Sequence, residues 1–262
     1  MEVQEMGNQR PVIGIAMRIE YSTDRFYLAR YYSEAVEAHG GIPVHIPLIP
    51  NSDYICALVD SLNGILLPGS DSDVDPNLYG QDPLPGLGSV HPIKDSTDLA
   101  LLQEAEARNI PVLAICFGMQ SLNVSRGGTL IQDLPGQLPQ AIKHDQGTPR
   151  DRKSHTISIH QDSLIHKLAG ATSELVNSHH HQAVDKIGRD LLGTASTSDG
   201  VVEAIEDSRP DRWIVGVQWH PELGWADDPL SSQLFDSFVR ACLEFKQRNT
   251  RENPKDISSV ST

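Results

Sequence analysis

The sequence predicts an α/β protein in which a mixed, mostly parallel central sheet carries helices on both faces and a small antiparallel sheet is added. Three observations lead to this fold class. Short apolar runs alternate with helical patterns through the first half, short alternating strand patterns fill the second half, and a long helical pattern closes the chain. Strands that alternate with helices form βαβ units, whose strands lie parallel in one sheet.

The first half predicts four strands, each followed by a helix. The expected strands are 12–17, 42–46, 64–67 and 112–115, and the expected helices are 28–38, 54–62, 96–108 and a segment from 118 onward. Gly40 and Gly41 suit the end of the first helix. Ligands of parallel sheets bind at the carboxyl ends of the strands, so the residues that follow 64–67 and 112–115 are the first candidates for a site.

The second half predicts short strands that we expect to be antiparallel, followed by a closing helix at about 230–247. The expected strands are 155–160, 175–177, 191–196, 201–205 and 213–219. No long linker interrupts the pattern, so residues 11–248 are expected to form a single domain. Residues 1–10 are expected to be a flexible N-terminus. Residues 249–262 are polar and without pattern, which is typical of a disordered tail.

Charge and composition narrow the class of protein. The chain of 262 residues has a formal net charge of −14, which would repel a nucleic acid backbone. No apolar run approaches the eighteen residues that a membrane span needs, and the first ten residues are too polar for a secretory signal. We therefore expect a cytoplasmic protein with no nucleic acid or membrane partner, and a homodimer is a reasonable expectation for a soluble enzyme.

Cys116 stands where the strand pattern 112–115 ends and a helix pattern begins. Small residues lie two positions before it, at Ala114, and two positions after it, at Gly118. This is the pattern of a nucleophile elbow, a sharp strand-to-helix turn with no room for bulky neighbours. The helix N–H groups would favour the thiolate of such a cysteine. Alone, the pattern also fits a buried core cysteine, the role expected for Cys56 and Cys242.

A second strand pattern ends in His220 and Glu222. In extended chain, residues i and i+2 point to the same side, so a base and the acid that orients it could share one strand end. Together with Cys116 they would form an activated nucleophile, in which the histidine accepts the thiol proton and the carboxylate fixes its tautomer. The alternative is a surface His-Pro-Glu turn.

Acyl transfer also needs donors for an oxyanion. The Phe117 N–H is one candidate, and the turn Pro68-Gly69-Ser70 can supply another because glycine allows close backbone approach. An ordinary strand-to-helix turn is the alternative for that segment.

Two polar segments imitate metal sites. The segment 71–82 is similar to a calcium loop, but Pro76 occupies the sixth position and Asp82 the twelfth, where glycine and glutamate are needed. In the segment 177–182, His179 and His181 would share a face if the chain were extended, yet no cysteine or carboxylate stands at ligand spacing. We therefore expect no metal and no cofactor, and a polar wall of the catalytic cleft at 177–182. Its histidines compete with His220 as base.

Four segments together resemble one family over most of the chain, from residue 12 to about residue 245. The segments 116–120 and 219–222 are similar to the nucleophile and His-x-Glu signatures of class I glutamine amidotransferase-like proteins. The segments 67–70 with 75–79, and 177–182, resemble the peptidase C26 branch of γ-glutamyl hydrolases. The resemblance implies a flavodoxin-like three-layer fold.

The resemblance also implies roles for individual residues. Cys116 would be the nucleophile, His220 the base and then the acid, and Glu222 the residue that orients the histidine. Gly69 or Ser70 and the Phe117 N–H would form the oxyanion hole, and Gln120 would help to hold the glutamyl group. The remaining expected substrate-binding residues come from one segment: Asn177, Ser178, His179 and His180.

The implied reaction is hydrolysis of a γ-glutamyl amide through a thioester, which releases glutamate and an amine without metal or nucleotide. The chain departs from this branch at Phe117, where an arginine is frequent, so the amine stays open among γ-aminobutyrate, a polyamine and an aromatic amine. The acidic residues at 71–75 favour a cationic one. The alternatives are a glutaminase subunit that passes ammonia to a synthase partner and a noncatalytic binding protein.

Overall fold

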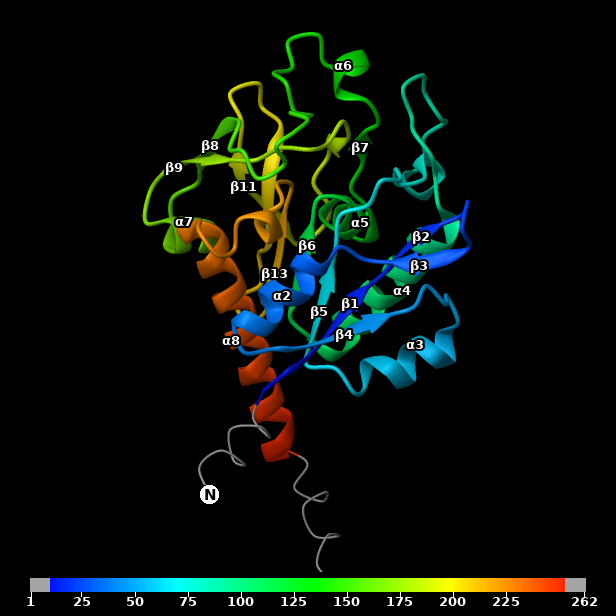
Figure 1. Cartoon of the computed structure of the whole chain (residues 1–262), viewed down its shortest axis with the longest axis vertical. Coiled ribbons are helices and arrows are strands. Elements are labelled where there is room, and N and C mark those ends of the chain that lie inside the picture. The colour runs from blue at the N-terminus through cyan, green and yellow to red at the C-terminus, as the bar shows by residue number, and fades with distance from the viewer. Residues whose placement is uncertain (1–9, 253–262) are drawn as a thin grey trace, which may run out of the picture.

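An eleven-stranded sheet runs through the computed structural model, which describes residues 10–252 (Figure 1). The strand order along the main path is β4-β1-β5-β6-β13-β12-β11-β8-β9. The first five strands of this order are parallel: β4 (Ile42–Ile46), β1 (Val12–Ala16), β5 (Gly64–Leu67), β6 (Val112–Ile115) and β13 (Ile214–Val217). The carboxyl ends of β5, β6 and β13 therefore meet at one edge of the sheet.

The other part of the sheet is antiparallel. It contains β12 (Val202–Asp207), β11 (Leu191–Ser196), β8 (His155–Ile159) and β9 (Ser173–Val176), and the short β10 (Ala183–Val184) pairs with β12 and with β7 (Leu130–Ile131). A separate two-stranded antiparallel sheet joins β2 (Arg18–Glu20) to β3 (Arg25–Tyr27). The mixed sheet and the small antiparallel sheet confirm the predicted fold class.

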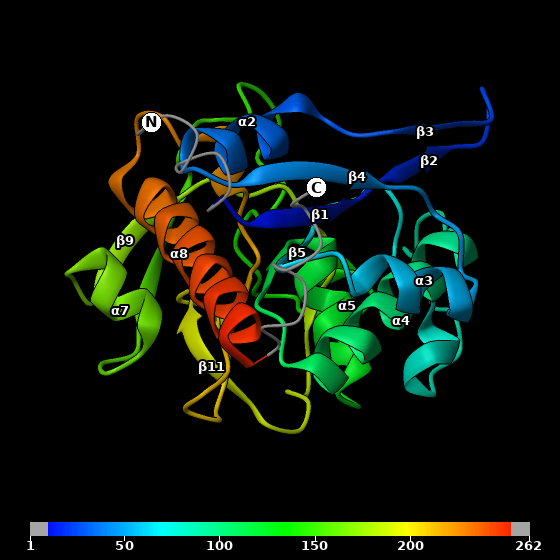
Figure 2. The ribbon, with the colours of Figure 1, turned by 90° about the horizontal axis from the view of Figure 1, so that it is seen from below.

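Helices cover both faces of the sheet, as the view from below shows (Figure 2). On one side lie α2 (Arg30–Ala38) and α8 (Pro229–Glu252), with α7 (Leu164–Ala169) against α8. On the other side α4 (Pro92–Arg108) packs between α3 (Ser52–Val59) and α5 (Phe117–Ser125). The remaining helical segments are short: α6 (Leu134–Gln137) and the 3-10 turns η1 (Pro76–Tyr79) and η2 (Pro221–Leu223).

Strand β6 shows how one apolar run serves two cores. Leu113 and Ile115 pack into the cluster that contains Phe235 of α8, whereas Val112 and Ala114 pack into the cluster on the α3–α4 side. Alternate side chains of a strand point to opposite faces, so a strand between two helical layers must be apolar at every position. All four residues of β6 are buried.

Several predicted elements differ from the structure at their ends or in direction. The strand predicted at 213–219 was expected to be antiparallel, but β13 pairs parallel to β6 and antiparallel only to β12. Its four residues are all buried, as suits a strand between two helical layers. Helix α4 begins at Pro92, since proline fits the first turn of a helix.

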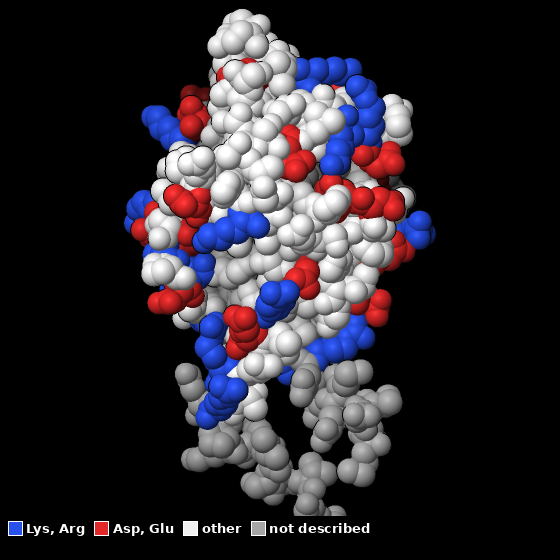
Figure 3. Space-filling view, turned by 90° about the vertical axis from the view of Figure 1, so that its left-hand side faces the viewer, with Lys and Arg blue, Asp and Glu red and all other residues white. Residues whose placement is uncertain are grey.

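The closing helix is longer than predicted. Helix α8 continues to Glu252, so residues 249–252, predicted as part of a disordered tail, are helical. The rest of that predicted tail and residues 1–9 of the predicted flexible N-terminus lie outside the described residues. The face drawn in Figure 3 carries basic and acidic side chains mixed together rather than one basic patch. Within residues 10–252, no helix has the length and apolar character to cross a membrane.

Candidate active site

Cys116 occupies a strained turn between β6 and α5. Its φ of 53° and ψ of −107° lie in a region that L-residues rarely adopt, and such strain costs about 1–3 kcal/mol unless the surroundings hold it in place. The Cys116 N–H donates a hydrogen bond of 2.8 Å to the Val217 carbonyl at the end of β13. The neighbouring parallel strand therefore holds the turn that ends β6.

Gly118 explains why the residues around this turn are small. A Cβ at Gly118 would collide with the carbonyl oxygen of Leu67, the last residue of β5. Helix α5 thus starts directly against the end of the adjacent strand. The side chain of Phe117 is buried in the core on the α4 side, where the ammonium of Lys94 lies 5.2 Å from its ring centroid.

His220 and Glu222 form a buried pair close to the end of β13. The Nδ1 atom of His220 lies 2.7 Å from Oε1 of Glu222, and since a carboxylate only accepts, Nδ1 carries the hydrogen. The two residues were expected on one face of an extended strand. Instead Glu222 lies in the turn η2, which brings the carboxylate back to the ring. The other ring nitrogen, Nε2, is buried without a hydrogen-bond partner in residues 10–252.

The charges around His220 favour an ion pair. Burial alone would lower the pKa of His220, but Glu222 and Cys116 together raise this pKa to about 10. Burial would likewise raise the pKa of Glu222, yet the charge of His220 holds the pKa of that carboxyl below its ordinary value. Both directions describe an imidazolium held by a carboxylate beside the thiol.

Asn177 fixes the backbone of His220 from both sides. Its Nδ2 donates to the His220 carbonyl and its Oδ1 accepts from the His220 N–H, each at 2.8 Å. The next residue, Ser178, is buried and donates its N–H to Oε1 of Gln146. Asn177 and Ser178 therefore support the histidine and the cavity wall, and they do not line the cavity.

A cavity of about 430 Å³ opens beside the thiol. Its lining contains the positive side chain of Arg150 and the negative side chains of Asp71, Asp73 and Asp145. His181 lies 2.8 Å from Asp73, and hydrogen bonding to this carboxylate raises the pKa of His181 to about 9. The lining residues are Ser70, Asp71, Ser72, Asp73, Cys116, Phe117, Gln120, Asp145, Gly147, Thr148, Arg150, His179, His180, His181 and Gln182.

Gln120 lines this cavity from the first turns of α5. Its Nε2 donates to the Gln182 carbonyl at 3.1 Å and to Oε1 of Gln218 at 3.3 Å. His179 also lines the cavity, with its ring centroid 5.7 Å from that of His220. Of the histidines at 179–181, His179 thus lies beside His220, and His180 is turned away toward a different cluster.

The turn after β5 lies against His220. A Cβ at Gly69 would lie 2.8 Å from Cε1 of His220, so the position has no room for a side chain. The Gly69 N–H donates to the hydroxyl of Tyr32 at 3.2 Å. Within the described residues, the Ser70 N–H makes no hydrogen bond to the protein. Ser70 lines the cavity, whereas Gly69 lies behind it.

Sequence reasoning missed Tyr32 and Arg18. The buried hydroxyl of Tyr32 accepts from Arg18 at 3.3 Å and from the Gly69 N–H. After burial and His220, this hydroxyl also contributes to the lowered pKa of Glu222. A signal for Arg18 was present, because it follows β1 at the same sheet edge that carries Cys116. Tyr32 had none, since it lies within an ordinary helix pattern.

Comparison with known proteins identifies a family. The family model of peptidase C26 matches residues 11–222. The chain is similar to a glutamine amidotransferase-like protein of Lactococcus lactis, 39% identical over 206 residues that cover 78% of this chain and 84% of that protein. It is also similar to the γ-glutamyl-γ-aminobutyrate hydrolase PuuD of Escherichia coli K12, 33% identical over 242 residues, 88% of this chain and 93% of that protein.

A solved structure supports the fold. A Thermoplasma acidophilum protein described as one of the subunits of GMP synthase superimposes with a TM-score of 0.64 at 15% identity, over 92% of this chain and 98% of that one. At this identity the similarity concerns the fold alone.

Proposed function

We propose that this chain, which belongs to the peptidase C26 family of glutamine amidotransferase-like proteins, is a hydrolase. Its substrate would be the γ-glutamyl amide bond of a small γ-glutamyl amine. One observation supports this most directly. The thiol of Cys116 is held at a strained turn and lines a cavity beside the buried His220–Glu222 pair. A positioned nucleophile, a base and an orienting acid are the parts that acyl transfer needs.

The reaction would proceed through a thioester. The Cys116 sulfur attacks the γ-carbonyl carbon, and His220 gives a proton to the amine nitrogen as the C–N bond breaks. His220 then accepts a proton from water, which attacks the thioester carbonyl. The C–S bond breaks, glutamate leaves, and the Cys116 thiolate beside protonated His220 is restored. Glu222 keeps the imidazole in the tautomer that this exchange requires.

Two backbone donors would stabilise the oxyanion. The Phe117 N–H follows the nucleophile at the start of α5, which is the usual donor position of an elbow. The second donor we assign to Ser70, because the Gly69 N–H is already bonded to Tyr32. Removal of one such donor costs about 3 kcal/mol of transition-state stabilisation.

The cavity suits a zwitterionic glutamyl group. Arg150 can pair with the α-carboxylate, and Asp145 or Asp71 can accept from the α-ammonium. These roles are proposed from the charges that line the cavity, and they leave the amine side of the substrate open.

The test is release of glutamate from a panel of substrates by the purified chain. γ-Glutamyl-γ-aminobutyrate, γ-glutamylputrescine and γ-glutamylanilide represent the three kinds of amine, and glutamine serves as the comparison. We expect at least one γ-glutamyl amine to be hydrolysed with a higher kcat/KM than glutamine. Activity on glutamine alone, and only with a synthase partner present, would instead identify an ammonia-supplying glutaminase.

The covalent intermediate gives a second test. Rapid quenching in acid followed by mass spectrometry should reveal a glutamyl adduct on Cys116. A Cys116→Ala variant should form no adduct, and an adduct on another residue would contradict the proposed mechanism.

A further inference from the structure

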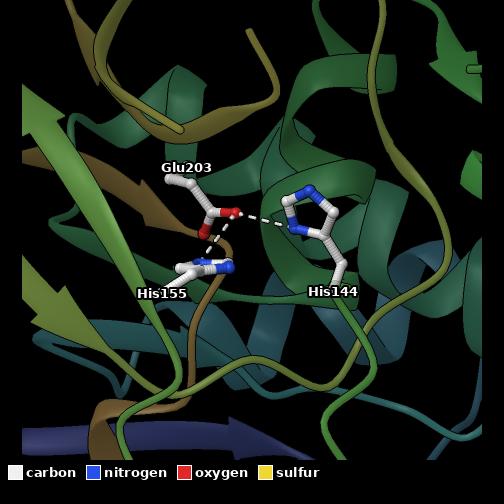
Figure 4. A group of neighbouring side chains, drawn as sticks. All are labelled: His144, His155 and Glu203. Atoms are coloured by element: carbon white, nitrogen blue, oxygen red, sulfur yellow. Dashed lines mark ion pairs between the residues drawn. The ribbon is translucent and has the colours of Figure 1, made fainter. Parts of the chain in front are cut away.

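Four buried ionisable side chains lie together beside the cavity that Cys116 lines, and one of them, His180, also belongs to the lining of that cavity. His144 comes from the loop after α6, His155 from the start of β8, His180 from the segment between β9 and β10, and Glu203 from β12. Their side chains are 2%, 5%, 2% and 0% exposed. Figure 4 shows the rings of His144 and His155 directed at the carboxylate of Glu203. The proposed reaction uses none of these four groups.

The distances in this cluster are too long for hydrogen bonds. One nitrogen each of His144, His155 and His180 lies 3.4 Å from Oε1 of Glu203, whereas an N–H···O hydrogen bond is about 2.7–3.2 Å long. In residues 10–252 these three nitrogens and both oxygens of Glu203 have no hydrogen-bond partner. A buried group without a partner costs about 1–3 kcal/mol, so five together require an explanation.

The partners of the outer ring nitrogens determine where the lone pairs point. Nδ1 of His180 lies 2.9 Å from the Gln182 carbonyl, and Nε2 of His144 lies 2.9 Å from a carboxylate oxygen of Asp199. Both oxygens can only accept, so these outer nitrogens carry the hydrogens. In the neutral rings, the lone pairs of the other nitrogens then face the Glu203 carboxylate. Lone pairs directed at an anion repel it unless a cation lies among them.

We propose that His144, His155 and Glu203, with His180 beside them, bind one divalent transition-metal ion, for which Zn²⁺ is the best match. Tetrahedral zinc with bonds of about 2.0–2.1 Å holds its ligands roughly 3.4 Å apart, and the three nitrogens lie 3.4 Å from the oxygen. One ligand atom each of His144, His155 and Glu203 also lies within 4.8 Å of the other two. Imidazole and carboxylate are common zinc ligands.

The surroundings of two of the three histidines match those of metal-binding histidines, whereas Nδ1 of His155 has no partner in the described residues. Such histidines donate their second N–H to a carboxylate or a backbone carbonyl, which orients the ring. His144 does so to Asp199, and His180 does so to the Gln182 carbonyl. The charges balance as well, because a dication offsets the two buried carboxylates of Glu203 and Asp199.

The location indicates a structural role. The side chains of His144, His155 and Glu203 are at most 5% exposed, and the proposed reaction uses none of them. The ion would tie β8 and β12 to two loops that line the catalytic cavity, the loop that follows His144 and the segment that contains His180. These loops already touch, since the His180 N–H donates to the His144 carbonyl at 3.2 Å. The ion would therefore hold the cavity wall on the antiparallel part of the sheet.

The experiment measures zinc binding by the full chain in a Cys116→Ala background, which removes the catalytic thiol as a competing ligand. The protein is dialysed against a chelator, then titrated with Zn²⁺ alone, and its metal content is determined. We expect one zinc per chain and a higher melting temperature with zinc. Glu203→Gln and His155→Gln should each weaken binding by at least 100-fold. His160→Gln alters an exposed histidine just beyond the same strand and should not change it.

Two outcomes would overturn the proposal. The first is absence of stoichiometric zinc in the Cys116→Ala protein, which would indicate that protonated histidines bind Glu203 instead. The second is unchanged affinity in both ligand variants, which would place the zinc elsewhere. If the ligand variants do not fold, X-ray absorption of the zinc-loaded Cys116→Ala protein decides: a first shell of nitrogen and oxygen with the outer-shell scattering of two or three imidazoles supports the site, and a sulfur ligand or a shell without imidazole contradicts it.

Discussion

The segment 177–182 contributes to two groups of histidine and glutamate, one around Glu222 and one around Glu203. The two groups differ in the distance between the ring nitrogens and the carboxylate oxygen. In the pair that we propose to be catalytic, Nδ1 of His220 lies 2.7 Å from Oε1 of Glu222 and donates a hydrogen bond to it. In the other cluster, three histidines surround Glu203 at 3.4 Å and none forms a hydrogen bond with it. The same residue types therefore hold a proton in one place and, as we propose, a metal ion in the other.

The difference follows from the number of histidines around each carboxylate. A single histidine can approach one carboxylate oxygen closely, share a proton with it and keep its other nitrogen for chemistry. The neutral rings of His144 and His180 cannot donate to this oxygen while their outer nitrogens donate elsewhere, so they remain at the spacing of metal ligands. Asn177 belongs to the first group and His180, three residues later, to the second.

The largest effect is expected from loss of the nucleophile or the base. Cys116→Ala and His220→Ala should each lower glutamate release by roughly 10⁴- to 10⁶-fold, because each residue forms or transfers bonds in the reaction. The measurement is the rate on the best substrate of the panel, with His45→Gln on β4 as an exposed control. If either variant keeps a tenth of the parental rate, the proposed mechanism is wrong.

Loss of the orienting acid should cost less and change the pH profile. Glu222→Gln should retain roughly a hundredfold more activity than Cys116→Ala, since the orienter forms no bond to substrate. Because Glu222 and Cys116 raise the pKa of His220 to about 10, the parental rate should fall only as pH rises through about 10. In the variant this alkaline limb should move to lower pH.

The same pKa has a consequence for stability. A histidine whose folded pKa is raised above its ordinary 6.5 contributes stability that is complete below pH 6.5 and is lost as pH rises toward 10. Unfolding in denaturant across this pH range should show the loss in the parent and a smaller one in Glu222→Gln. An identical pH dependence of rate and stability in both proteins would contradict the ion pair.

The zinc affinity of the cluster around Glu203 should depend on Asp199, the carboxylate that accepts a hydrogen bond from His144. Asp199→Asn weakens the hydrogen bond that orients His144, so zinc affinity should fall about 10- to 100-fold. Zinc titration of the variant measures this, and Asp53→Asn, an exposed position on α3, is the matched control. An affinity equal to the control would show that His144 is not a ligand.

The smallest effect is expected at the residue that supports the catalytic histidine from behind. Asn177→Ala removes two hydrogen bonds to the backbone of His220, so the free energy of unfolding should fall by about 1–3 kcal/mol. We expect roughly a tenfold loss of rate and unchanged zinc affinity. Asn77→Ala, on the exposed turn η1, controls for loss of an amide. A change in zinc affinity without a change in rate would contradict the assignment of Asn177 to the His220–Glu222 pair.

The sequence predicted best where one local pattern decides the structure. The strands at 42–46, 64–67 and 112–115 have the predicted bounds, since each is a short run rich in Ile, Val or Leu that ends directly before a proline or before Cys116. The sharp turn at Cys116 after the third of these strands was also predictable, because the small residues Ala114 and Gly118 on either side of the cysteine are typical of such a turn. The direction of β13 was not, since strand polarity depends on which neighbour it meets.

The sequence by itself determined the fold class, the edge of the sheet where Cys116 stands and the pairing of His220 with Glu222, because each depends on residues close together in the chain. Only the tertiary structure decided that Tyr32 occupies the Gly69 N–H, and that His144, His155 and His180 meet at Glu203. These residues come from separate strands and loops. Their meeting depends on strand order and loop packing, which no spacing along the chain records.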